Sequence, residues 1–278
     1  MFGGLATKPV AVRPATLQAG SMLITPNRNN LNRIVVLNPK GGSGKTTLAT
    51  NIASYYAKLG PMPTIMDCDP QGSTMRWLDK RDASRPPVHG IAAFKKTMQA
   101  TRSWQLRVPN ETENLIVDSP ASLDHGKLRE LTRDATSILV PVLPSSIDIH
   151  AASRCIADLL LVAKIDRRDN KLAVVANRTR HNTNSFDQLM RFLDSLGIPI
   201  IAVMRDSQNY VRAAEDGIGV CDMPPHKVRK DMDAMNQIIY WLDSWKDRGR
   251  EHRRAAPLRN EGSDGKVTVL HKPKLRSV

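Results

Sequence analysis

Short apolar runs alternate with stretches of helical spacing through the middle of the chain. The first run, residues 33–37, is rich in β-branched residues, which is typical of a strand buried on both faces of a parallel sheet. A stretch with helical spacing follows over 47–59 and is closed by Gly60 and Pro61. Further strands are predicted at 63–66, 115–117, 137–142, 172–176 and 198–203, and further helices at 149–163, 185–196 and 228–245.

This alternation predicts an α/β fold with a doubly wound, mostly parallel sheet that carries helices on both faces. The predicted domain spans 31–246. Residues 1–30 contain prolines, glycines and asparagines without a sustained period, so they are expected to form an irregular arm. Residues 247–278 are expected to form a basic flexible tail. In sheets of this kind, ligands bind beyond the carboxyl ends of the strands.

Composition narrows the class of protein. The chain has 278 residues, of which 41% are hydrophobic and 24% charged, and this balance is typical of a globular protein rather than a disordered one. No apolar run approaches the roughly 20 residues that span a bilayer. The three cysteines lie far apart in the sequence, so a disulfide framework is not expected and a reducing cytoplasm fits.

The excess of positive charge points to a polyanionic partner. Lys and Arg number 41 against 27 Asp and Glu, which gives a formal net charge of +14. Residues 1–30 hold three basic and no acidic residues, and residues 246–278 hold ten basic and four acidic residues. The sign alone does not distinguish nucleic acid from anionic lipid. The tail could act as a solubilising segment or as an electrostatic contact with DNA.

A glycine-rich loop follows the first predicted strand. Residues 38–47 read NPKGGSGKTT, and glycines at these positions let several backbone N–H groups point at one anion. The helix that begins at Lys45 adds its positive end, and Lys45 would hold the β- and γ-phosphates. The Thr46 hydroxyl would ligate magnesium. Pro39 stands where the generic pattern has glycine. The candidate nucleotide-binding residues are Gly41, Gly42, Ser43, Gly44, Lys45, Thr46 and Thr47.

Two further strand ends carry acids. Asp118 follows the run over 115–117, where a carboxylate suits a magnesium site, with waters between the acid and the ion. The second strand ends in Asp67-Cys68-Asp69-Pro70, a sequence that also suits a plain turn. Beside a phosphate loop, one of these two acids is expected near magnesium and the other near the attacking water. The predicted metal residues are Thr46, Asp67 and Asp118.

The segment from Lys40 to Thr47 resembles the deviant Walker A motif of the ParA/MinD family of positioning ATPases. In that family the extra lysine, here Lys40, crosses an ATP-bound dimer interface to reach the partner's nucleotide. The resemblance implies that Asp69 positions the lytic water and that 115–120 form the Walker B and switch II segment. It also places Asn177 at the adenine. The resemblance covers about 32–245 and leaves both tails outside.

The resemblance implies a Mg²⁺-dependent ATPase that forms a homodimer with ATP. Such a dimer would bind nonspecific DNA of the nucleoid, so the expected location is the cytoplasm in association with the nucleoid. An adaptor or a ParB- or McdB-like activating protein would stimulate hydrolysis. The cargo would be a plasmid, a chromosome or a carboxysome.

DNA binding is expected to depend on basic charge in the last third of the chain. The candidate contacts lie near the helices that close the fold, and solvated surface is the alternative interpretation for each of them. They are Arg205, Arg212, Lys227, Arg229 and Lys230.

Two other functions stay open at this point. One is a membrane-associated ATPase of MinD type, but Pro257, Gly262, Gly265 and Pro273 interrupt the sequence where a membrane-targeting helix would lie, so no membrane is expected. The apolar stripe in 228–245 is interpreted as core packing. The other is a P-loop enzyme acting on a small molecule, such as a ligase or a kinase.

Overall fold

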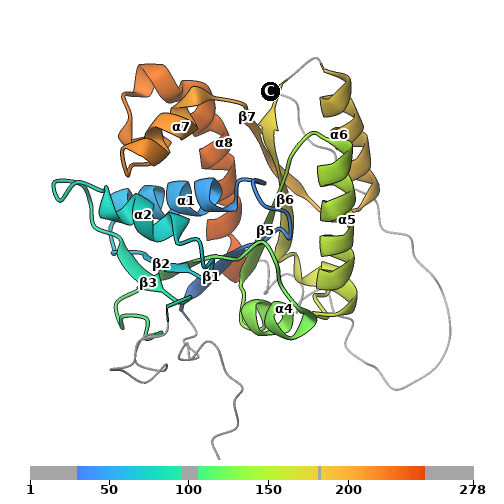
Figure 1. Cartoon of the computed structure of the whole chain (residues 1–278), viewed down its shortest axis with the longest axis horizontal. Coiled ribbons are helices and arrows are strands. Elements are labelled where there is room, and N and C mark those ends of the chain that lie inside the picture. The colour runs from blue at the N-terminus through green and yellow to red at the C-terminus, as the bar shows by residue number, and fades with distance from the viewer. Residues whose placement is uncertain (1–29, 96–105, 181–182, 248–278) are drawn as a thin grey trace, which may run out of the picture.

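A computed structural model of the chain describes residues 30–95, 106–180 and 183–247. The predicted arm and tail therefore lie outside the described residues, apart from Asn30 and Asp247. Strands and helices alternate along the described chain (Figure 1). In order they are β1 (Asn32–Val36), α1 (Lys45–Leu59), β2 (Thr64–Asp67), α2 (Ser73–Asp79), β3 (His89–Ala92), β4 (Asn114–Asp118), α4 (His125–Thr132), β5 (Ser137–Val142), α5 (Ser146–Leu161), η1 (Arg167–Asp169), β6 (Leu172–Thr179), α6 (Asn184–Ser195), β7 (Ile200–Arg205), α7 (Gln208–Glu215), η2 (Val220–Asp222) and α8 (Pro225–Asp243).

Seven described strands form one parallel sheet in the order β3-β2-β4-β1-β5-β6-β7. This arrangement confirms the predicted fold class. In the register of the sheet, Asp118 stands beside Val36 on one side and Asp67 on the other. The end of β1, from which the glycine loop leaves, and both acidic strand ends therefore lie at one edge of the sheet.

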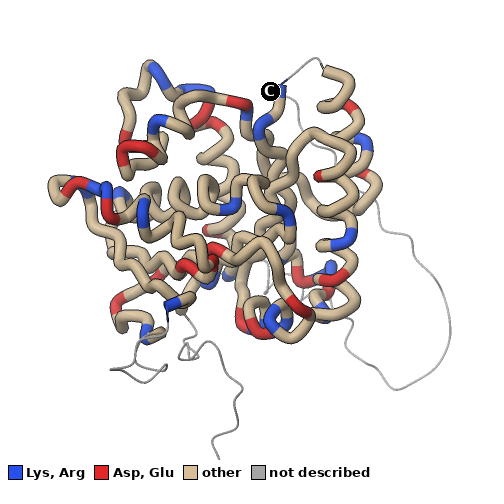
Figure 2. The backbone as a smooth tube through the Cα atoms, in the orientation of Figure 1, with Lys and Arg blue, Asp and Glu red and all other residues tan. Residues whose placement is uncertain are grey.

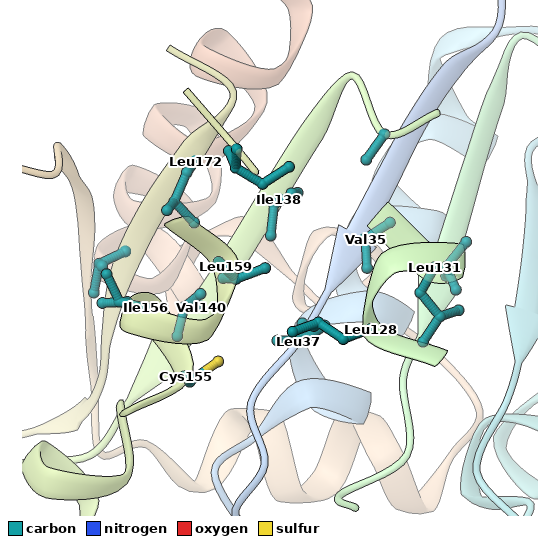
Figure 3. Packing of buried hydrophobic residues seen from close by; sticks show 14 of the residues in the cluster. Val35, Leu37, Leu128, Leu131, Ile138, Val140, Cys155, Ile156, Leu159 and Leu172 are labelled. Carbon is teal, nitrogen blue, oxygen red and sulfur yellow. The ribbon is translucent and has the colours of Figure 1, made fainter. Parts of the chain in front are cut away.

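Helices cover both faces of the sheet, and consecutive strand residues alternate between the two layers. Val35 belongs to the layer beneath α4, α5 and α6, whereas Ile34 and Val36 belong to the layer beneath α1, α7 and α8. Figure 3 shows part of the first layer, in which Leu131 of α4 and Ile156 of α5 lie against strand side chains. The two layers hold the sheet rigid beneath the loops at its carboxyl edge.

The six predicted strands are present, one with the predicted ends and the others with shifts of one to three residues, but β3 was not predicted from the sequence. It has four residues, includes Gly90 and lacks a run of β-branched residues. A Cβ on Gly90 would lie 2.3 Å from Leu78 Cδ2 and 3.1 Å from Met75 Cε. Gly90 therefore lets the side chains of α2 lie close to this edge strand, and the glycine that weakens the strand pattern serves tertiary packing.

Helix α8 confirms the prediction that its apolar stripe is core. Met235, Ile238 and Leu242 have no exposed surface. No helix in the described part of the chain is long and apolar enough to cross a membrane.

A buried ion pair joins the end of α2 to η2. Arg81 Nη1 lies 3.2 Å from Asp222 Oδ2, and the two side chains are 4% and 1% exposed. Arg81 Nη1 also donates to Ser54 Oγ and to the Gly217 carbonyl, each at 3.2 Å. The Ser54 hydroxyl and the Gly219 amide both donate to the same Asp222 oxygen. The segment that follows α2 is thereby fixed to α1 and to η2.

We expect Arg81→Met to lower the free energy of unfolding by about 3–5 kcal/mol, because it leaves the Asp222 carboxylate buried without its cation. The matched control is Arg168→Met, which breaks an exposed pair with Asp166 and is expected to cost less than about 1 kcal/mol. Urea unfolding of both variants measures the difference. Equal losses for the two variants would show that the Arg81 pair does not stabilise the fold.

Candidate nucleotide-binding site

The glycine loop between β1 and α1 forms an open pocket of about 240 Å³ at the carboxyl edge of the sheet. Gly42 has a φ of 76° and Gly44 a φ of 96°, which is a left-handed conformation that favours glycine. The Asn38 side chain ties the loop down: its Nδ2 donates to the Pro141 carbonyl at 2.7 Å, and its Oδ1 accepts from the Lys40 amide at 2.9 Å. The loop is therefore held in its turn by the end of β5.

Lys45 begins α1 and is 6% exposed. Its Nζ donates to the Lys40 carbonyl at 3.1 Å, so the side chain folds back along the loop. Burial lowers the pKa of Lys45, and the carboxylates of Asp118 and Asp69 act in the opposite direction. A buried cation beside a loop of backbone N–H groups suits a polyphosphate, whose charge would favour the protonated amine.

Asp118 ends β4 and contacts two threonine hydroxyls. Thr46 Oγ1 and Thr74 Oγ1 both donate to Asp118 Oδ2, each at 2.7 Å. Burial raises the pKa of Asp118 to about 6, although both hydroxyl donors lower it. Its Oδ1 is buried without a hydrogen-bond partner among the described residues. An unpartnered carboxylate oxygen beside a threonine hydroxyl fits the predicted magnesium site, in which a water of the ion would donate to that oxygen.

Ionisation of Asp118 is expected to cost the apo protein stability as the pH rises from about 4 to about 6. The folded chain holds the Asp118 proton with a pKa of about 6 against an ordinary value of 3.8, so it binds that proton more tightly than the unfolded chain. The stabilising contribution is complete below the ordinary pKa and is lost as the pH rises through 6, for a total of about 3 kcal/mol. Unfolding free energies in EDTA should show this slope in the wild type. In Asp118→Asn the total loss of unfolding free energy over this pH range should be smaller by about 3 kcal/mol. Equal losses in the two proteins would contradict the assignment.

Asp67 and Asp69 occupy different environments. Asp67 has no exposed surface, and its two oxygens accept hydrogen bonds from the amides of Asp69 and Met75 at 3.0 and 3.1 Å. Burial raises the pKa of Asp67, and these backbone donors lower it. Asp67 therefore shapes the loop before α2 and has less capacity left for a metal than Asp118 has. Asp69 lines the pocket, and its Oδ1 accepts from the Gln71 amide at 2.9 Å.

The Lys40 ammonium is held by a residue that the sequence analysis did not identify. Lys40 Nζ lies 2.6 Å from Asp148 Oδ2 in the first turn of α5, and the Asp148 side chain is 4% exposed. Ser145 caps this helix: its hydroxyl contacts Asp148 Oδ2 and accepts from the Asp148 amide at 3.2 Å. The sequence signal was the capping pattern of a serine followed three residues later by an acid. It predicts a helix start but not a contact with the glycine loop.

Asn177 lies at the back of the glycine loop. It is 4% exposed, and its Nδ2 donates to the Ser43 carbonyl at 2.9 Å. In this state its amide group fastens β6 to the loop, and its placement at the adenine stays a prediction. Of the residues predicted for the pocket, the structure brings together Gly41, Gly42, Gly44, Lys45, Thr46, Thr47 and Asp69 as lining residues.

The five predicted DNA contacts do not share one role. Arg205 forms a two-pronged ion pair with the buried Asp231, with N–O distances of 2.7 and 2.8 Å, so its guanidinium already has a structural partner. Arg212 on α7 and Lys227, Arg229 and Lys230 on α8 are exposed. Figure 2 shows basic and acidic positions mixed over the described chain. The exposed basic residues on α7 and at the start of α8 therefore form a local cluster, and the described chain does not present a uniformly basic face.

A glycine loop between a parallel strand and a helix, with a buried lysine and with an acid at the end of the neighbouring strand of the sheet, defines a P-loop nucleotide-binding protein. Residues 34–220 match the family described as the CobQ/CobB/MinD/ParA nucleotide binding domain (CbiA). The chain belongs to this family.

Two curated relatives are named maintenance of carboxysome distribution protein A. The relative from Halothiobacillus neapolitanus is 29% identical over 211 residues, which cover 74% of this chain and 94% of the relative. The relative from Gloeobacter kilaueensis is 28% identical and is covered to 93%, with 76% of this chain aligned. The septum site-determining protein MinD of Thermotoga maritima is 26% identical, over 75% of this chain and 88% of that protein.

Solved structures share the fold. A putative plasmid partition protein from Borrelia burgdorferi bound to AMPPNP superposes with a TM-score of 0.57 at 11% identity, covering 76% of this chain and 99% of that one. Apo McdA from Cyanothece gives a TM-score of 0.55 at 13% identity, with 78% and 99% covered. These likenesses support the P-loop arrangement of the sheet and its helices.

Proposed function

We propose that this chain is a ParA-type ATPase that dimerises with ATP, binds nonspecific nucleoid DNA and positions a cellular cargo. The observation that carries the proposal is the Lys40 ammonium beside the phosphate loop, ion-paired with Asp148 rather than folded back along the loop as Lys45 is. A second lysine placed there is not needed to bind the chain's own phosphates. With a third of its side chain exposed, Lys40 would reach the nucleotide of a second copy.

The chain's own pocket would bind the triphosphate. Lys45 and the loop amides would hold the phosphate oxygens, and Thr46 with Asp118 would hold Mg²⁺. When bound, Mg²⁺ neutralises charge that develops on the phosphate oxygens during transfer. Asp69, which faces the pocket, would orient the attacking water and accept its hydrogen bond.

Dimer formation would exchange one Lys40 partner for another. In the single chain, Asp148 holds the ammonium, and its carboxylate is buried and fixed by Ser145. In the ATP-bound dimer, Lys40 would turn to the phosphates bound by the second copy, where an added cation stabilises the transferred phosphoryl group. Hydrolysis would thereby depend on dimerisation, and a ParB- or McdB-like activator or adaptor would accelerate it.

The cargo assignment rests on the relatives. Two of them are named for carboxysome distribution, which favours a carboxysome as the cargo over a plasmid or chromosome. The expected location is the cytoplasm, in association with the nucleoid.

DNA binding by the ATP-bound form is expected to weaken steeply with salt, because cations that contact phosphates release counterions. Replacing Lys227 or Lys230 by glutamine should lower the slope of log affinity against log salt by about 1 for each phosphate contact removed. Lys127→Gln is the matched control, because Lys127 is an exposed lysine on α4, across the sheet. Gel retardation of a random duplex across a salt series measures the slopes. If the Lys227 and Lys230 variants have the same slope as Lys127→Gln and the wild type, α8 does not contact DNA.

One comparison separates this function from its alternatives. The protein with ATP is mixed in parallel with duplex DNA and with anionic liposomes, and retardation and flotation are measured. A DNA shift that needs ATP, without flotation, is the expected result. Flotation with ATP and no DNA shift would instead indicate a MinD-like membrane role. ATP turnover that appears only with a small-molecule acceptor would indicate a ligase or kinase.

A further inference from the structure

Thr74, the second residue of α2, is a buried polar residue that the sequence analysis did not select. It has no exposed surface, and its hydroxyl donates to Asp118 Oδ2 at 2.7 Å. A buried hydroxyl needs a hydrogen-bond partner, and a threonine inside a helix commonly finds it in the carbonyl one turn earlier. Thr74 instead contacts the carboxylate at the end of β4, which raises the question of what it does for Asp118.

Another buried helical threonine shows the ordinary arrangement. Thr132 has no exposed surface either, and its hydroxyl donates to the Leu128 carbonyl at 2.8 Å, within α4. Helix α2 begins only at Ser73, so no carbonyl of the same helix lies one turn before Thr74. Because side chains in a helix tilt toward its N-terminus, the Thr74 hydroxyl reaches back to the strand ends and meets Asp118.

Consecutive residues of α2 serve the two acids that stand side by side in the sheet. Asp67 and Asp118 are register partners on β2 and β4. Asp67 Oδ2 accepts from the backbone amide of Met75 at 3.1 Å, a contact that any residue type except proline would make. Asp118 accepts from the side chain of Thr74, so the residue type matters at that position.

The hydroxyl of Thr74 leaves the other oxygen of Asp118 available. Thr46 Oγ1 donates to the same Oδ2 at 2.7 Å, so both hydroxyls bond one carboxylate oxygen. Asp118 Oδ1 is buried and has no hydrogen-bond partner among the residues that the structure describes. Two donors on one oxygen fix the plane of the carboxyl group and thereby the direction of Oδ1. Oδ1 is the oxygen that would accept from a water of magnesium.

The two donors would act differently once an ion is bound. Thr46 lines the pocket, and its hydroxyl would itself ligate magnesium. Thr74 is fully buried and is not among the residues that line the pocket, so its hydroxyl would contact neither the ion nor its waters. Its hydrogen bond would stay the same on binding, and it would hold Asp118 in one orientation before and after the ion arrives.

We propose that Thr74 is a positioning residue for magnesium, which holds the Asp118 carboxylate in the orientation that a metal-bound water requires. The inference rests on the proposed function, because it takes Asp118 to serve a magnesium ion that accompanies the nucleotide. It adds a residue of α2 to a site otherwise formed by the glycine loop and β4. Removing an outer hydrogen bond of this kind typically weakens metal binding by about tenfold to a hundredfold.

Calorimetric titration with ADP, in EDTA and at a series of free Mg²⁺ concentrations, isolates the contribution of the ion without requiring dimerisation or hydrolysis. Thr74→Val keeps the branched shape and removes the donor, whereas Thr74→Ser keeps the donor. Thr74→Ala is a second variant without the donor and replaces Thr74→Val should the latter fold poorly. Thr132→Val is the matched control, because it removes an equally buried hydroxyl that bonds within α4.

We expect Thr74→Val and Thr74→Ala to need about tenfold or more free Mg²⁺ for half of the gain in ADP affinity that the ion gives. Their ADP affinity in EDTA should equal that of the wild type. Thr74→Ser and Thr132→Val should behave as the wild type in both conditions.

Two results would overturn the proposal. One is a wild-type dependence on Mg²⁺ in both Thr74→Val and Thr74→Ala. The other is an equal loss of ADP affinity with Mg²⁺ and in EDTA, which would show that Thr74 supports the shape of the pocket and not the ion. A wild type that binds no ADP, or binds it without response to Mg²⁺, would instead refute the proposed function itself.

Discussion

Lys40→Ala is expected to bind ATP normally and to hydrolyse it about a thousandfold more slowly than the wild type under activating conditions. Lys45 and the loop amides remain to hold the phosphates, so affinity should be preserved. The loss falls on the transition state, where a cation supplied by the second copy would stabilise the charge on the transferred phosphoryl group. Single-turnover hydrolysis and equilibrium nucleotide binding, measured on the same preparation, separate the two effects.

The control for this variant is Lys58→Ala. Lys58 lies in the last turn of α1 and donates to the Cys221 carbonyl at 2.7 Å, so its loss removes the same charge far along the helix from the phosphate loop. Its hydrolysis should match that of the wild type. Unchanged hydrolysis in Lys40→Ala would mean that Lys40 is a surface cation held by Asp148 and nothing more.

Asp69→Asn is expected to slow hydrolysis by about a hundredfold or more, while ATP-bound dimers accumulate on DNA. An asparagine keeps an oxygen that can accept from the Gln71 amide, as Asp69 Oδ1 does at 2.9 Å, so the loop should keep its shape. What is lost is the negative charge that would orient and polarise the attacking water. ATP turnover and the lifetime of the DNA complex after removal of free ATP measure the two consequences.

Asp82→Asn is the matched control, because Asp82 caps an exposed turn, accepting from the Ser84 amide at 2.7 Å. Its turnover and its DNA lifetime should equal those of the wild type. A normal turnover in Asp69→Asn would place the water-orienting group elsewhere in the pocket. Slow turnover with no change in DNA lifetime would separate hydrolysis from release.

Local patterns predicted most of the fold and the centre of the site. The β-branched run before the glycine loop and the acids after two later strands are periodic or contiguous signals, and parallel topology brings their ends together. Asp118 and Thr46 accordingly meet at 2.7 Å as the motif implies. The part of the site that could be predicted from the sequence is the part carried by local motifs at the strand ends, which the parallel sheet brings together.

The remainder depends on contacts between distant segments. Strand β3 is short and contains Gly90, whose lack of a side chain serves the packing of α2. Asp148 reaches Lys40 across 108 positions, and the sequence signals only a helix cap there. The left-handed backbone of Arg178, near the end of β6, arises from Asn177 and the irregular pairing of β6, which no local propensity predicts.

The central claim is that ATP joins two copies of this chain. The molar mass of the wild-type protein in solution, measured by light scattering with Mg²⁺ and a nonhydrolysable ATP analogue and again with ADP, tests it most directly. We predict twice the mass of the 30.8 kDa chain with the analogue and the mass of one chain with ADP. One chain's mass with the saturating analogue, or an equal mass in both nucleotides, would contradict the account.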